Sequence, residues 1–560
     1  MKIALVKSPW WVRYCPPYIL AFFSTYLRGK GHEVSLFDLN NTLYHKVKPE
    51  LKKYWDDRDY YSVWENPAFI EMIMAVPEMK ESINSIIETN TDIICFTTHT
   101  PNTRISEEIA RNIKQENKEK IIVFLGHKCS RAQMAYDFAS RPYIDYVCTG
   151  EAEIALCNLV EKLKDLREGD DLPECDGFLL KRNGKIVDCG NPPVVDDLDS
   201  LPFPDYEDFT DDIEKNTYSQ AGRLDILDSR GCINACHFCY ERLYWQKFRT
   251  MSGSRIYEQI KYHTDSFPQV NYFYFNGLLL NADLKVLEEF CDLVIDNDMK
   301  ITWAGQAMIR ADMTGALLKK MRSAGCVWLG YGVESGSQSV LRSMNKRLKV
   351  SDAVNVLKDT HDAGISIQIN IMIGFPGETE DDLGQTLEFV KQVRPYIDNI
   401  LASQSFCTLE KETYMCKNPA KFGITGGNHH LYWKSDGGSN NYAERFRRYE
   451  EFCKRALRLG VPETSGVLLK KPDKWVLLGD YYYFEKDYAR AAECYEMSIA
   501  EEFQNKSIYK KLARAYEEVC NYRKAIYNYN KTLEFKPEEF GTSGIDVSIK
   551  AKIKELEQKL

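Results

Sequence analysis

Residues 229–240 read Ser-Arg-Gly-Cys-Ile-Asn-Ala-Cys-His-Phe-Cys-Tyr, which places Cys232, Cys236 and Cys239 at the spacing C-x3-C-x2-C. In a chain of 560 residues with no expected secretory leader, such cysteines are better metal ligands than disulfide partners. A structural zinc site usually takes four protein ligands, whereas an iron–sulfur cluster held by three thiolates keeps one iron free. We therefore predict a cluster with an open iron. The alternative is a structural zinc site completed by His237.

This motif, with the aromatic Phe238 before its last cysteine, resembles the cluster motif of the radical S-adenosylmethionine (SAM) enzymes. The resemblance implies that Cys232, Cys236 and Cys239 hold a 4Fe-4S cluster. It also implies that the free iron binds the amino and carboxylate groups of SAM, whose carbon–sulfur bond is split to give a 5'-deoxyadenosyl radical. The chain is thus expected to be a radical SAM enzyme.

The composition is that of a soluble globular protein, with 44% hydrophobic and 28% charged residues. The length allows about three or four domains. No charge-poor apolar run reaches the roughly 18 residues that cross a bilayer, so no transmembrane segment is expected. Seventeen cysteines without a pairing pattern predict a reducing, anaerobic cytoplasm. A net charge of -9 argues against a general nucleic-acid surface.

The first 165 residues alternate short apolar strands with amphipathic helices, which predicts a Rossmann-like, doubly wound parallel sheet. Such a sheet binds ligands at the carboxyl ends of its strands. A segment between about residues 41 and 90, rich in Tyr, Trp and Lys, interrupts the pattern. The expected elements are residues 2–7, 18–28, 33–38, 92–97, 106–115, 121–125, 132–138, 144–148 and 154–163.

Segments 120–127 and 144–153 resemble the cobalamin-binding domain that precedes many radical SAM enzymes. The resemblance implies that the loops after the strands surround cobalamin. The Asp-x-His-x-x-Gly sequence that supplies a cobalt ligand in some such domains is absent after the first strand, so no lower histidine ligand is expected from that loop. The alternative is a Rossmann-like domain that has lost its cofactor. The implied cobalamin contacts are Ser8, Trp10, Trp11, Thr97, Thr98, Gly126, Gly150 and Glu151.

Residues 166–215 are rich in Asp, Pro and Gly, which indicates a linker with a small hairpin that belongs to no core. Residues 216–445 return to alternating strands and helices. Six such repeats match the partial (β/α)6 barrel of the radical SAM family, whose chemistry lies at the carboxyl ends of the strands. The strands are expected at residues 224–226, 272–275, 301–304, 327–331, 366–373 and 400–404.

The resemblance places SAM contacts after successive barrel strands. Asn276-Gly277 stands where the family has a Gly-Gly-Glu-like turn, although the acidic residue is missing here. Arg310 could pair with a carboxylate, and the alternative is an exposed helix start. Glu334-Ser335 resembles the ribose and methionine contact, and the alternative is a buried helix cap. The implied SAM contacts are Phe238, Asn276, Gly277, Gln306, Arg310, Glu334, Ser335 and Gly374.

Residues 423–441 are expected to form a substrate-side loop in which His429 and His430 provide polar lining, with a metal site as the alternative. Residues 446–560 are expected to be helical. Within residues 472–539 a pattern of aromatic and small residues recurs after about 34 positions, the period of tetratricopeptide repeats, and residues 548–560 are expected to cap them. Such repeats could bind a partner or carrier protein, or only support the barrel.

These resemblances imply a cobalamin-dependent radical SAM methyltransferase acting on an unactivated carbon of a small molecule, lipid or carrier-bound intermediate. One alternative keeps the radical without methyl transfer, as a cyclase, a rearrangement enzyme or a carbon–carbon bond-forming enzyme. A second alternative is an adaptor protein that works through its repeats, although the three cluster cysteines speak against it. A reductant such as flavodoxin or ferredoxin is the expected electron donor. No general acid or base is predicted.

Overall fold

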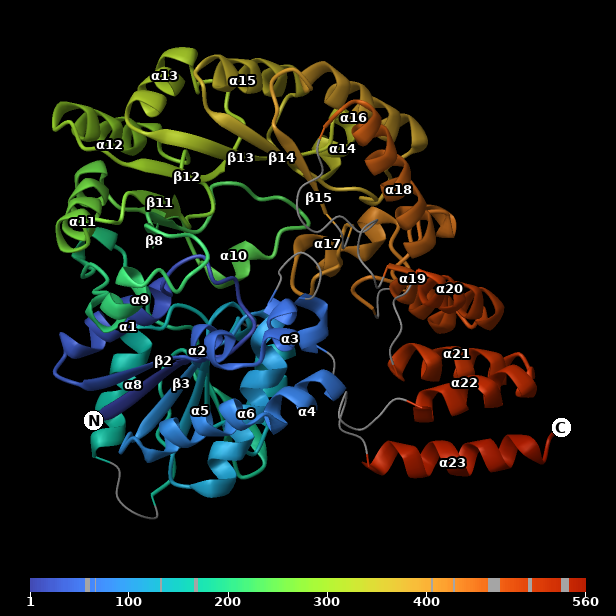
Figure 1. Ribbon diagram of the computed structural model, residues 1–560. Helices are drawn as coiled ribbons and strands as arrows, with labels where there is room; N and C mark the ends of the chain where they lie inside the picture. Colours follow the sequence, from blue (N-terminus) through green and yellow to red (C-terminus); the bar gives the residue numbers. More distant parts are fainter. Residues whose placement is uncertain are drawn as a thin grey trace.

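The computed structural model describes residues 1–55, 61–65, 67–130, 133–165, 170–403, 406–426, 429–461, 474–501, 506–534 and 543–560. Two sheets with their covering helices are stacked on each other, and a column of helices from the carboxyl-terminal part of the chain runs beside them (Figure 1). In the described part of the chain, no helix combines the length and the apolar character of a bilayer span.

The amino-terminal sheet has seven strands in the order β2-β1-β3-β4-β5-β6-β7. Its first five strands are parallel, and the last two add to its edge in antiparallel fashion. The predicted parallel α/β arrangement is therefore confirmed. The strands are β1 (Lys2–Lys7), β2 (Glu33–Asp38), β3 (Ile93–Thr97), β4 (Ile121–Leu125), β5 (Tyr146–Cys148), β6 (Phe178–Arg182) and β7 (Lys185–Asp188).

Helices cover both faces of this sheet because its strands are apolar on both sides. In β1, Ile3 and Leu5 pack with helices α1 and α8, whereas Ala4 and Val6 pack with the helices on the opposite face. The segment between β2 and β3 adds several of those helices. The helices are α1 (Tyr18–Arg28), α2 (Leu39–Lys46), α3 (Pro49–Lys52), α4 (Pro67–Ala75), α5 (Pro77–Glu88), α6 (Thr103–Glu116), α7 (Gln133–Ser140) and α8 (Glu153–Lys164).

Strands β6 and β7 correct the prediction that residues 166–215 contain only a linker hairpin outside the core. Phe178, Leu179 and Leu180 are buried, and β6 pairs with β5 of the first sheet. The hairpin therefore belongs to the amino-terminal core, because its apolar residues cover the end of that sheet. The chain then crosses to the second sheet through residues that include α9 (Thr210–Glu214).

The second sheet has six strands in the order β15-β14-β13-β12-β11-β8, and every neighbouring pair is parallel. This open sheet agrees with the predicted partial barrel. Its strands are β8 (Arg223–Ile226), β11 (Tyr272–Phe275), β12 (Thr302–Ala307), β13 (Cys326–Glu334), β14 (Ser366–Ile371) and β15 (Asn399–Ala402). Its helices are α11 (Gly253–Ser266), α12 (Leu284–Asp296), α13 (Gly315–Ser323), α14 (Gln338–Ser343), α15 (Val350–Asp362) and α16 (Glu380–Val393).

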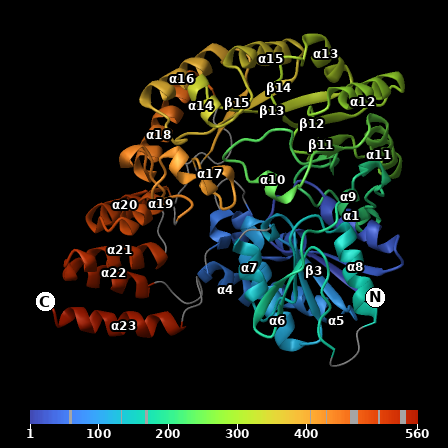
Figure 2. The ribbon, with the colours of Figure 1, turned by 180° about the vertical axis from the view of Figure 1, so that it is seen from behind.

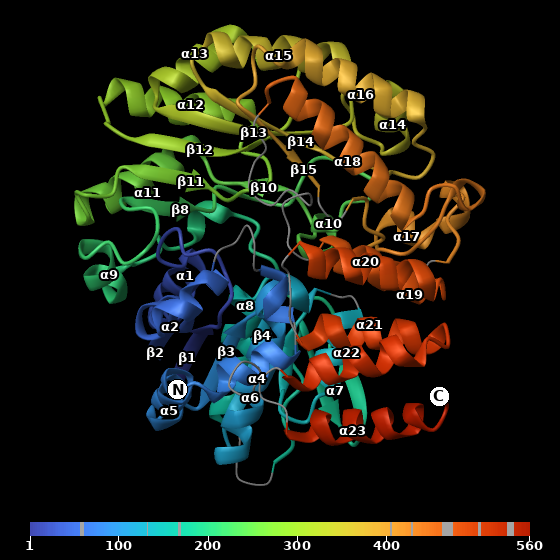
Figure 3. The same ribbon diagram turned by 45° about the vertical axis from the view of Figure 1, so that its right-hand side comes forward.

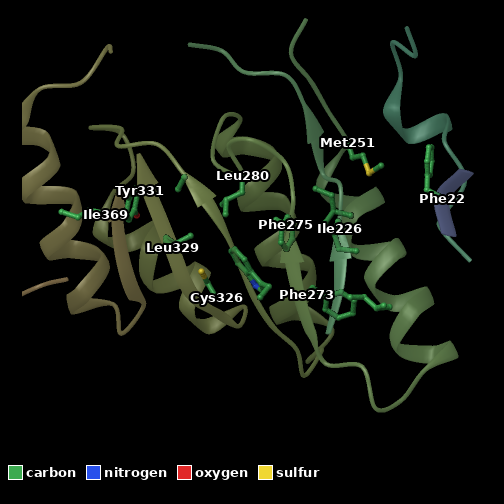
Figure 4. Close-up of a cluster of buried hydrophobic side chains, with 14 of the residues drawn as sticks. Phe22, Ile226, Met251, Phe273, Phe275, Leu280, Cys326, Leu329, Tyr331 and Ile369 are labelled. Carbon is green, nitrogen blue, oxygen red and sulfur yellow. The ribbon is translucent and has the colours of Figure 1, made fainter. Parts of the chain in front are cut away.

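Alternation along the barrel strands separates an apolar outer side from a polar inner side. Phe273 and Phe275 of β11 are buried under the helices (Figure 4), whereas Tyr272 and Tyr274 of the same strand are only half-buried. Gln306 of β12 donates from Nε2 to the Tyr274 hydroxyl across the inner side (3.2 Å). The strands therefore leave hydrogen-bonding groups facing the interior of the open barrel.

From Tyr442 onward the described structure is helical, and its helices stack beside both sheets (Figures 2 and 3). A Cβ atom added at Gly479 would lie 2.5 Å from the ring of Tyr495, so only glycine permits this close approach of α19 and α20. Helix α18 packs on the barrel, and its Phe446 contacts Trp475 of α19. The helices are α18 (Tyr442–Arg458), α19 (Lys474–Phe484), α20 (Tyr488–Ala500), α21 (Lys506–Glu518), α22 (Tyr522–Glu534) and α23 (Ser543–Glu557).

Candidate functional site

A cavity of about 1090 Å3 lies between the two sheets, where the carboxyl ends of their strands meet. Parallel sheets bind ligands at the carboxyl ends of their strands, and this edge of both sheets faces the same cavity. Tyr240, Glu241, Tyr244 and Trp245, which follow the last of the three cysteines, form one wall, whereas the cysteines themselves do not line the cavity. Residues on the cavity include Lys7, Trp11, Cys15, Thr97, His99, Gly126, His127, Arg223, Asp225, Tyr240, Glu241, Tyr244, Tyr274, Asn276, Glu410, Lys411 and His430.

The cavity separates the predicted cobalamin contacts into two groups. Trp11, Thr97 and Gly126 line it, as the resemblance implied. Ser8, Trp10 and Thr98 are buried next to them in the amino-terminal core and are not among the lining residues. Within each of these loops, therefore, only part of the side chains reach the cavity.

Gly126 is a position at which the fold requires glycine. Its φ of 109° is unfavourable for other residues, and an added Cβ would lie 2.6 Å from the carbonyl oxygen of Thr98. The loop after β4 can therefore approach the loop after β3 closely. This contact fixes the shape of the cavity wall on the amino-terminal side.

Gly150 and Glu151, the last predicted cobalamin contacts, have another role. A Cβ at Gly150 would lie 2.8 Å from the Cγ atom of Pro192, so Gly150 packs against the crossing segment. The Glu151 carboxylate accepts from Nη1 of Arg230 (2.7 Å) and from Nη1 of Arg249 (3.0 Å). Neither Gly150 nor Glu151 lines the cavity. Glu151 thus joins the two sheets and does not face a ligand.

Glu151 belongs to a buried ion network, which we define as Glu151, Glu153, Arg230 and Arg249. Arg230 donates from Nη2 to Glu153 Oε1 (2.6 Å), and Arg249 donates from Nη2 to Glu151 Oε1. Arg230 and Glu151 are each only 2% exposed. Burial alone would lower the pKa of the Arg230 guanidinium, but the two carboxylates outweigh it and raise this pKa.

The ion network holds the base of the cysteine loop. Strand β9 (Ser229–Arg230) pairs with β10 (Arg249–Thr250), so the residues between them form a loop with a closed stem. Gly231 begins the loop at a φ of 82°, where a Cβ would lie 2.5 Å from the Lys247 carbonyl oxygen. The first sheet therefore contacts the cysteine loop two residues before its first cysteine.

Cys232, Cys236 and Cys239 are half-buried cysteines on this loop, and none of them forms a disulfide. Burial raises the pKa of Cys236 and raises that of Cys239 to about 11. Within the described residues, no three metal-binding side chains are already arranged around a common point. The cysteines are thus neighbours on one loop, and their side chains must turn toward each other to hold a cluster.

The turn after β11 is tightly packed against the residues before the cysteine loop. The Gly277 N–H donates to Asp228 Oδ1 (3.1 Å), and a Cβ at Gly277 would lie 2.3 Å from Ser229 Oγ. Burial raises the pKa of the Asp228 carboxyl to about 6. Asn276, the neighbouring predicted SAM contact, lines the cavity and donates to Asp225 Oδ2 (2.7 Å). Asn276 is thus available to a ligand in the cavity.

Arg310 differs from the expectation of a free guanidinium. It donates from Nε and Nη2 to the Asp312 carboxylate (2.9 and 2.7 Å), and from Nη1 to the carbonyl oxygens of Asn281 and Ala282. These bonds occupy the donors that a SAM carboxylate would need. The alternative given for Arg310, an exposed helix start, does not describe it either, because its side chain is 20% exposed and the next helix begins at Gly315.

Lys346 is a cation that the sequence analysis missed. Its Nζ donates to Glu334 Oε1 (3.1 Å), and its side chain is 13% exposed. Burial alone would lower its pKa, but the charges of Glu334 and of the Cys236 thiolate raise it. No motif surrounds Lys346 in the sequence, so only the fold shows that it lies beside the cysteine loop.

The other predicted SAM contacts divide between ligand and structural roles. Glu334 has a φ of 74° and faces Lys346. Ser335 is fully buried and bonded to Thr386 Oγ1 (3.1 Å), which agrees with the structural alternative. A Cβ at Gly374 would lie 2.4 Å from the Arg445 side chain, so glycine is needed there for packing. Phe238 packs on a small apolar cluster beneath the loop.

A row of aromatic rings on the cavity wall was also missed. Trp11 stacks on His99 with 4.4 Å between ring centroids, and His127 stacks on Tyr244 at 4.3 Å. Burial lowers the pKa of His99 to about 3, so its ring is neutral. His99 and His127 follow β3 and β4, which means that the cavity has imidazoles although the loop after β1 has none.

The loop predicted on the substrate side reaches the cavity through His430, whereas His429 stacks on Tyr432 at 4.0 Å. Burial lowers the pKa of both histidines. Gly427 and Asn428 lie outside the described residues. The placement of His430 agrees with the predicted polar lining.

Residues 226–390 match the family described as the Radical SAM superfamily. They form a radical SAM domain. This domain contains the cysteine loop and most of the second sheet. The match includes the cysteine motif and extends through four of the barrel strands after it, so the predicted 4Fe-4S cluster and SAM do not rest on the three cysteines alone.

Curated proteins similar to the chain include an uncharacterized methyltransferase of Pyrococcus horikoshii, 24% identical over 51% of this chain and 60% of that protein. They also include an anaerobic magnesium-protoporphyrin IX monomethyl ester cyclase of Rubrivivax gelatinosus, 23% identical over 58% of this chain and 57% of that protein. The chain thus spans less than two thirds of the length of these relatives.

Two solved structures share the overall fold. The cobalamin-dependent S-adenosylmethionine radical enzyme OxsB with aqua-cobalamin bound has a TM-score of 0.61 at 14% identity, over 100% of this chain and 84% of that chain. The radical S-adenosylmethionine methyltransferase TsrM of Kitasatospora setae, with cobalamin and a 4Fe-4S cluster bound, has a TM-score of 0.58 at 15% identity, over 80% of this chain and 81% of that chain. At these identities the likeness shows the fold.

The radical SAM domain offers donors of the kind that its cofactors need. Thiolates are the usual ligands of iron–sulfur clusters, and the three thiols lie on one loop. Lys346 adds a positive charge beside the loop, and Asn276 adds an amide on the cavity. These residues fit a 4Fe-4S cluster with SAM next to it.

Proposed function

We propose that the protein is a cobalamin-dependent radical SAM methyltransferase that acts on an unactivated carbon. The observation that carries this proposal is the shared cavity, because loops of the amino-terminal sheet and the cysteine loop line the same space. When bound, the cluster with SAM supplies a carbon-centred radical, and cobalamin supplies a methyl group. Trp11, His99 and Gly126 would border the cobalamin, and Tyr240 and Glu241, which follow Cys239, line the same cavity.

The remaining expectations are part of this proposal. The substrate is a small molecule, a lipid or a carrier-bound intermediate, and the enzyme works in an anaerobic cytoplasm. Helices α19–α22 are two tetratricopeptide repeats, supported by the close approach at Gly479, and α23 caps them. Cyclisation or rearrangement remains the second candidate, because a cyclase is among the similar proteins. No residue of the described site favours it over methyl transfer.

We expect protein prepared anaerobically with hydroxocobalamin to retain about one cobalamin and four iron atoms per chain. Gly126→Ala should lower cobalamin retention several-fold without changing the iron content, because the new Cβ displaces the wall formed with Thr98. Absorbance of the cobalamin and iron analysis measure both quantities.

Gly184→Ala is the matched control, since Gly184 also has a positive φ but has open space around its Cβ position. It should retain cobalamin as the wild type does. Wild-type protein that retains iron but never cobalamin would refute the proposed methyltransferase and leave the Rossmann-like domain without its cofactor.

A second expectation concerns Lys346, which we propose as the partner of the SAM carboxylate in place of Arg310. Lys346→Met should weaken SAM binding by roughly tenfold or more, since a hydrogen bond to a charged group contributes about 1.5–3 kcal/mol. Arg310→Met should weaken it much less, because Arg310 already bonds to Asp312. Equilibrium binding of SAM to the reconstituted protein measures both variants. A larger loss with Arg310→Met would reverse the assignment.

A further inference from the structure

The cysteine loop has an outer side that faces away from the cavity. Two segments hold it there by main-chain hydrogen bonds. The His237 N–H donates to the Met344 carbonyl oxygen (2.9 Å), and the Met415 N–H donates to the His237 carbonyl oxygen (3.0 Å). The segments are residues 338–349, which begin with α14, and residues 410–422, which include α17 (Tyr414–Lys417). We call the exposed part of these two segments the outer surface.

The outer surface is basic although the chain as a whole is acidic. Its two segments contain seven Lys or Arg residues and two Glu residues, whereas the net charge of the chain is -9. Lys346 pairs with Glu334 and Lys417 pairs with Glu412, and the other five cations have no carboxylate within ion-pair distance among the described residues. All five are exposed; Arg342, Arg347, Lys349 and Lys421 belong to the outer surface, whereas Lys411 lines the cavity.

An aromatic contact connects the outer surface with the cysteines. The ring of His237, which stands between Cys236 and Cys239 in the sequence, stacks on Tyr414 with 4.5 Å between centroids. Tyr414 is 45% exposed, so part of its ring is open to solvent. Lys421 lies over the Tyr414 ring at 4.8 Å from Nζ and donates to its hydroxyl (3.1 Å). Two stacked rings therefore connect this surface with the cysteine loop.

Another basic part of the chain lacks these features. The groove lined by Arg111, Lys114, Lys118 and Arg141 has a carboxylate for three of its four cations, namely Glu108 for Arg111, Asp145 for Lys114 and Glu107 for Arg141. It also lies in the amino-terminal unit, whereas the cysteines belong to the radical SAM domain. Of these two basic regions, only the outer surface has several cations without a carboxylate partner next to the cysteines.

We propose that the outer surface docks a small acidic electron-transfer protein that reduces the cluster. The inference rests on the proposed function, because only a radical SAM reaction needs this electron. One electron passes from the reduced flavin or iron–sulfur group of the donor to the cluster, and no atom is transferred. Opposite charges steer such encounters, and redox partners bind through small contact areas, so a few exposed cations suffice.

The test uses the full chain and an acidic flavodoxin as the probe. Arg342→Glu, Arg347→Glu and Lys421→Glu are combined in one variant. The control combines Lys285→Glu, Lys319→Glu and Arg322→Glu, which are exposed positions on α12 and α13 of the same domain. Both variants lose the same charge, so only the place of the change differs. None of the six residues takes part in the proposed cofactor sites.

Binding of oxidised flavodoxin, which does not require a loaded cluster, is measured at low and at high ionic strength. We expect wild type and control to bind equally at low salt and to lose affinity as salt rises, and the outer-surface variant to bind roughly tenfold or more weakly at low salt. Equal binding by the two variants, or wild-type binding that is indifferent to salt, would overturn the proposal.

Reduction of the reconstituted protein gives the second readout. Flavodoxin hydroquinone should become semiquinone about tenfold more slowly with the outer-surface variant than with the control, whereas dithionite should reduce both at the same rate. An equal loss with both reductants would place the defect in the cluster and contradict docking. The proposed function fails separately, if the wild type reduced by dithionite does not cleave SAM.

Discussion

Replacing Cys232, Cys236 and Cys239 with Ala is expected to remove the cluster and to abolish SAM cleavage. The three thiols lie on one loop between β9 and β10, and no second group of three metal-binding side chains is arranged around a common point elsewhere in the described residues. Without thiolates, nothing on this loop can hold iron. Iron content should fall from about four atoms per chain to nearly none, and 5'-deoxyadenosine formation should become undetectable by chromatography.

Cys520→Ala is the control, because Cys520 is exposed and lies among the carboxyl-terminal helices. It should keep the iron content and the cleavage rate of the wild type. One zinc ion per chain in the wild type, lost in the triple variant, would favour the structural zinc site instead. Full cleavage by the triple variant would end the radical SAM assignment.

We expect the second large effect, on the free energy of unfolding, when the ion network of Glu151, Glu153, Arg230 and Arg249 is broken. Glu151→Gln keeps the shape of the side chain but removes the charge that faces two buried guanidinium groups. Breaking a buried ion pair from one side costs about 3–5 kcal/mol, because the remaining charge stays buried without its partner. The free energy of unfolding should fall by about that amount, as measured by denaturant unfolding of the full chain.

The matched control for this effect is Glu174→Gln. Glu174 forms an ion pair with Arg182 at 2.6 Å, but its side chain is 53% exposed. Exposed pairs contribute about 0–1 kcal/mol, so this variant should unfold almost as the wild type does. A Glu151→Gln variant as stable as the control would mean that the network does not join the two sheets energetically.

Strand positions could be predicted from the sequence because they depend on local alternation of apolar residues. The fourth barrel repeat shows this, since residues 327–331 were expected and β13 runs from Cys326 to Glu334. The hairpin of β6 and β7 was misjudged because Pro and Gly surround it, although its Phe-Leu-Leu run was a usable signal. Composition averaged over residues 166–215 concealed that run.

The candidate site was predictable only where a motif carries the chemistry. The cysteines have such a motif. Lys346 and His99 have none, and only the tertiary fold brings them to the site. Glu151 was assigned to a ligand because it follows a strand end, but its partner Arg230 is 79 positions away in the sequence. A buried carboxylate can bind a ligand or pair with an arginine that is distant in the sequence, and local sequence patterns do not distinguish these two partners.

The paired stem of β9 and β10 has a consequence for damage by oxygen. If oxidation destroys the cluster, the stem and its ion pairs still tie both ends of the cysteine loop to the first sheet. When the cluster leaves a loop whose ends are already paired, the loop loses little further order, because its ends stay together and no closure entropy is released. Cluster-free protein should therefore accept new iron and sulfide without refolding either sheet, which makes the damaged enzyme repairable.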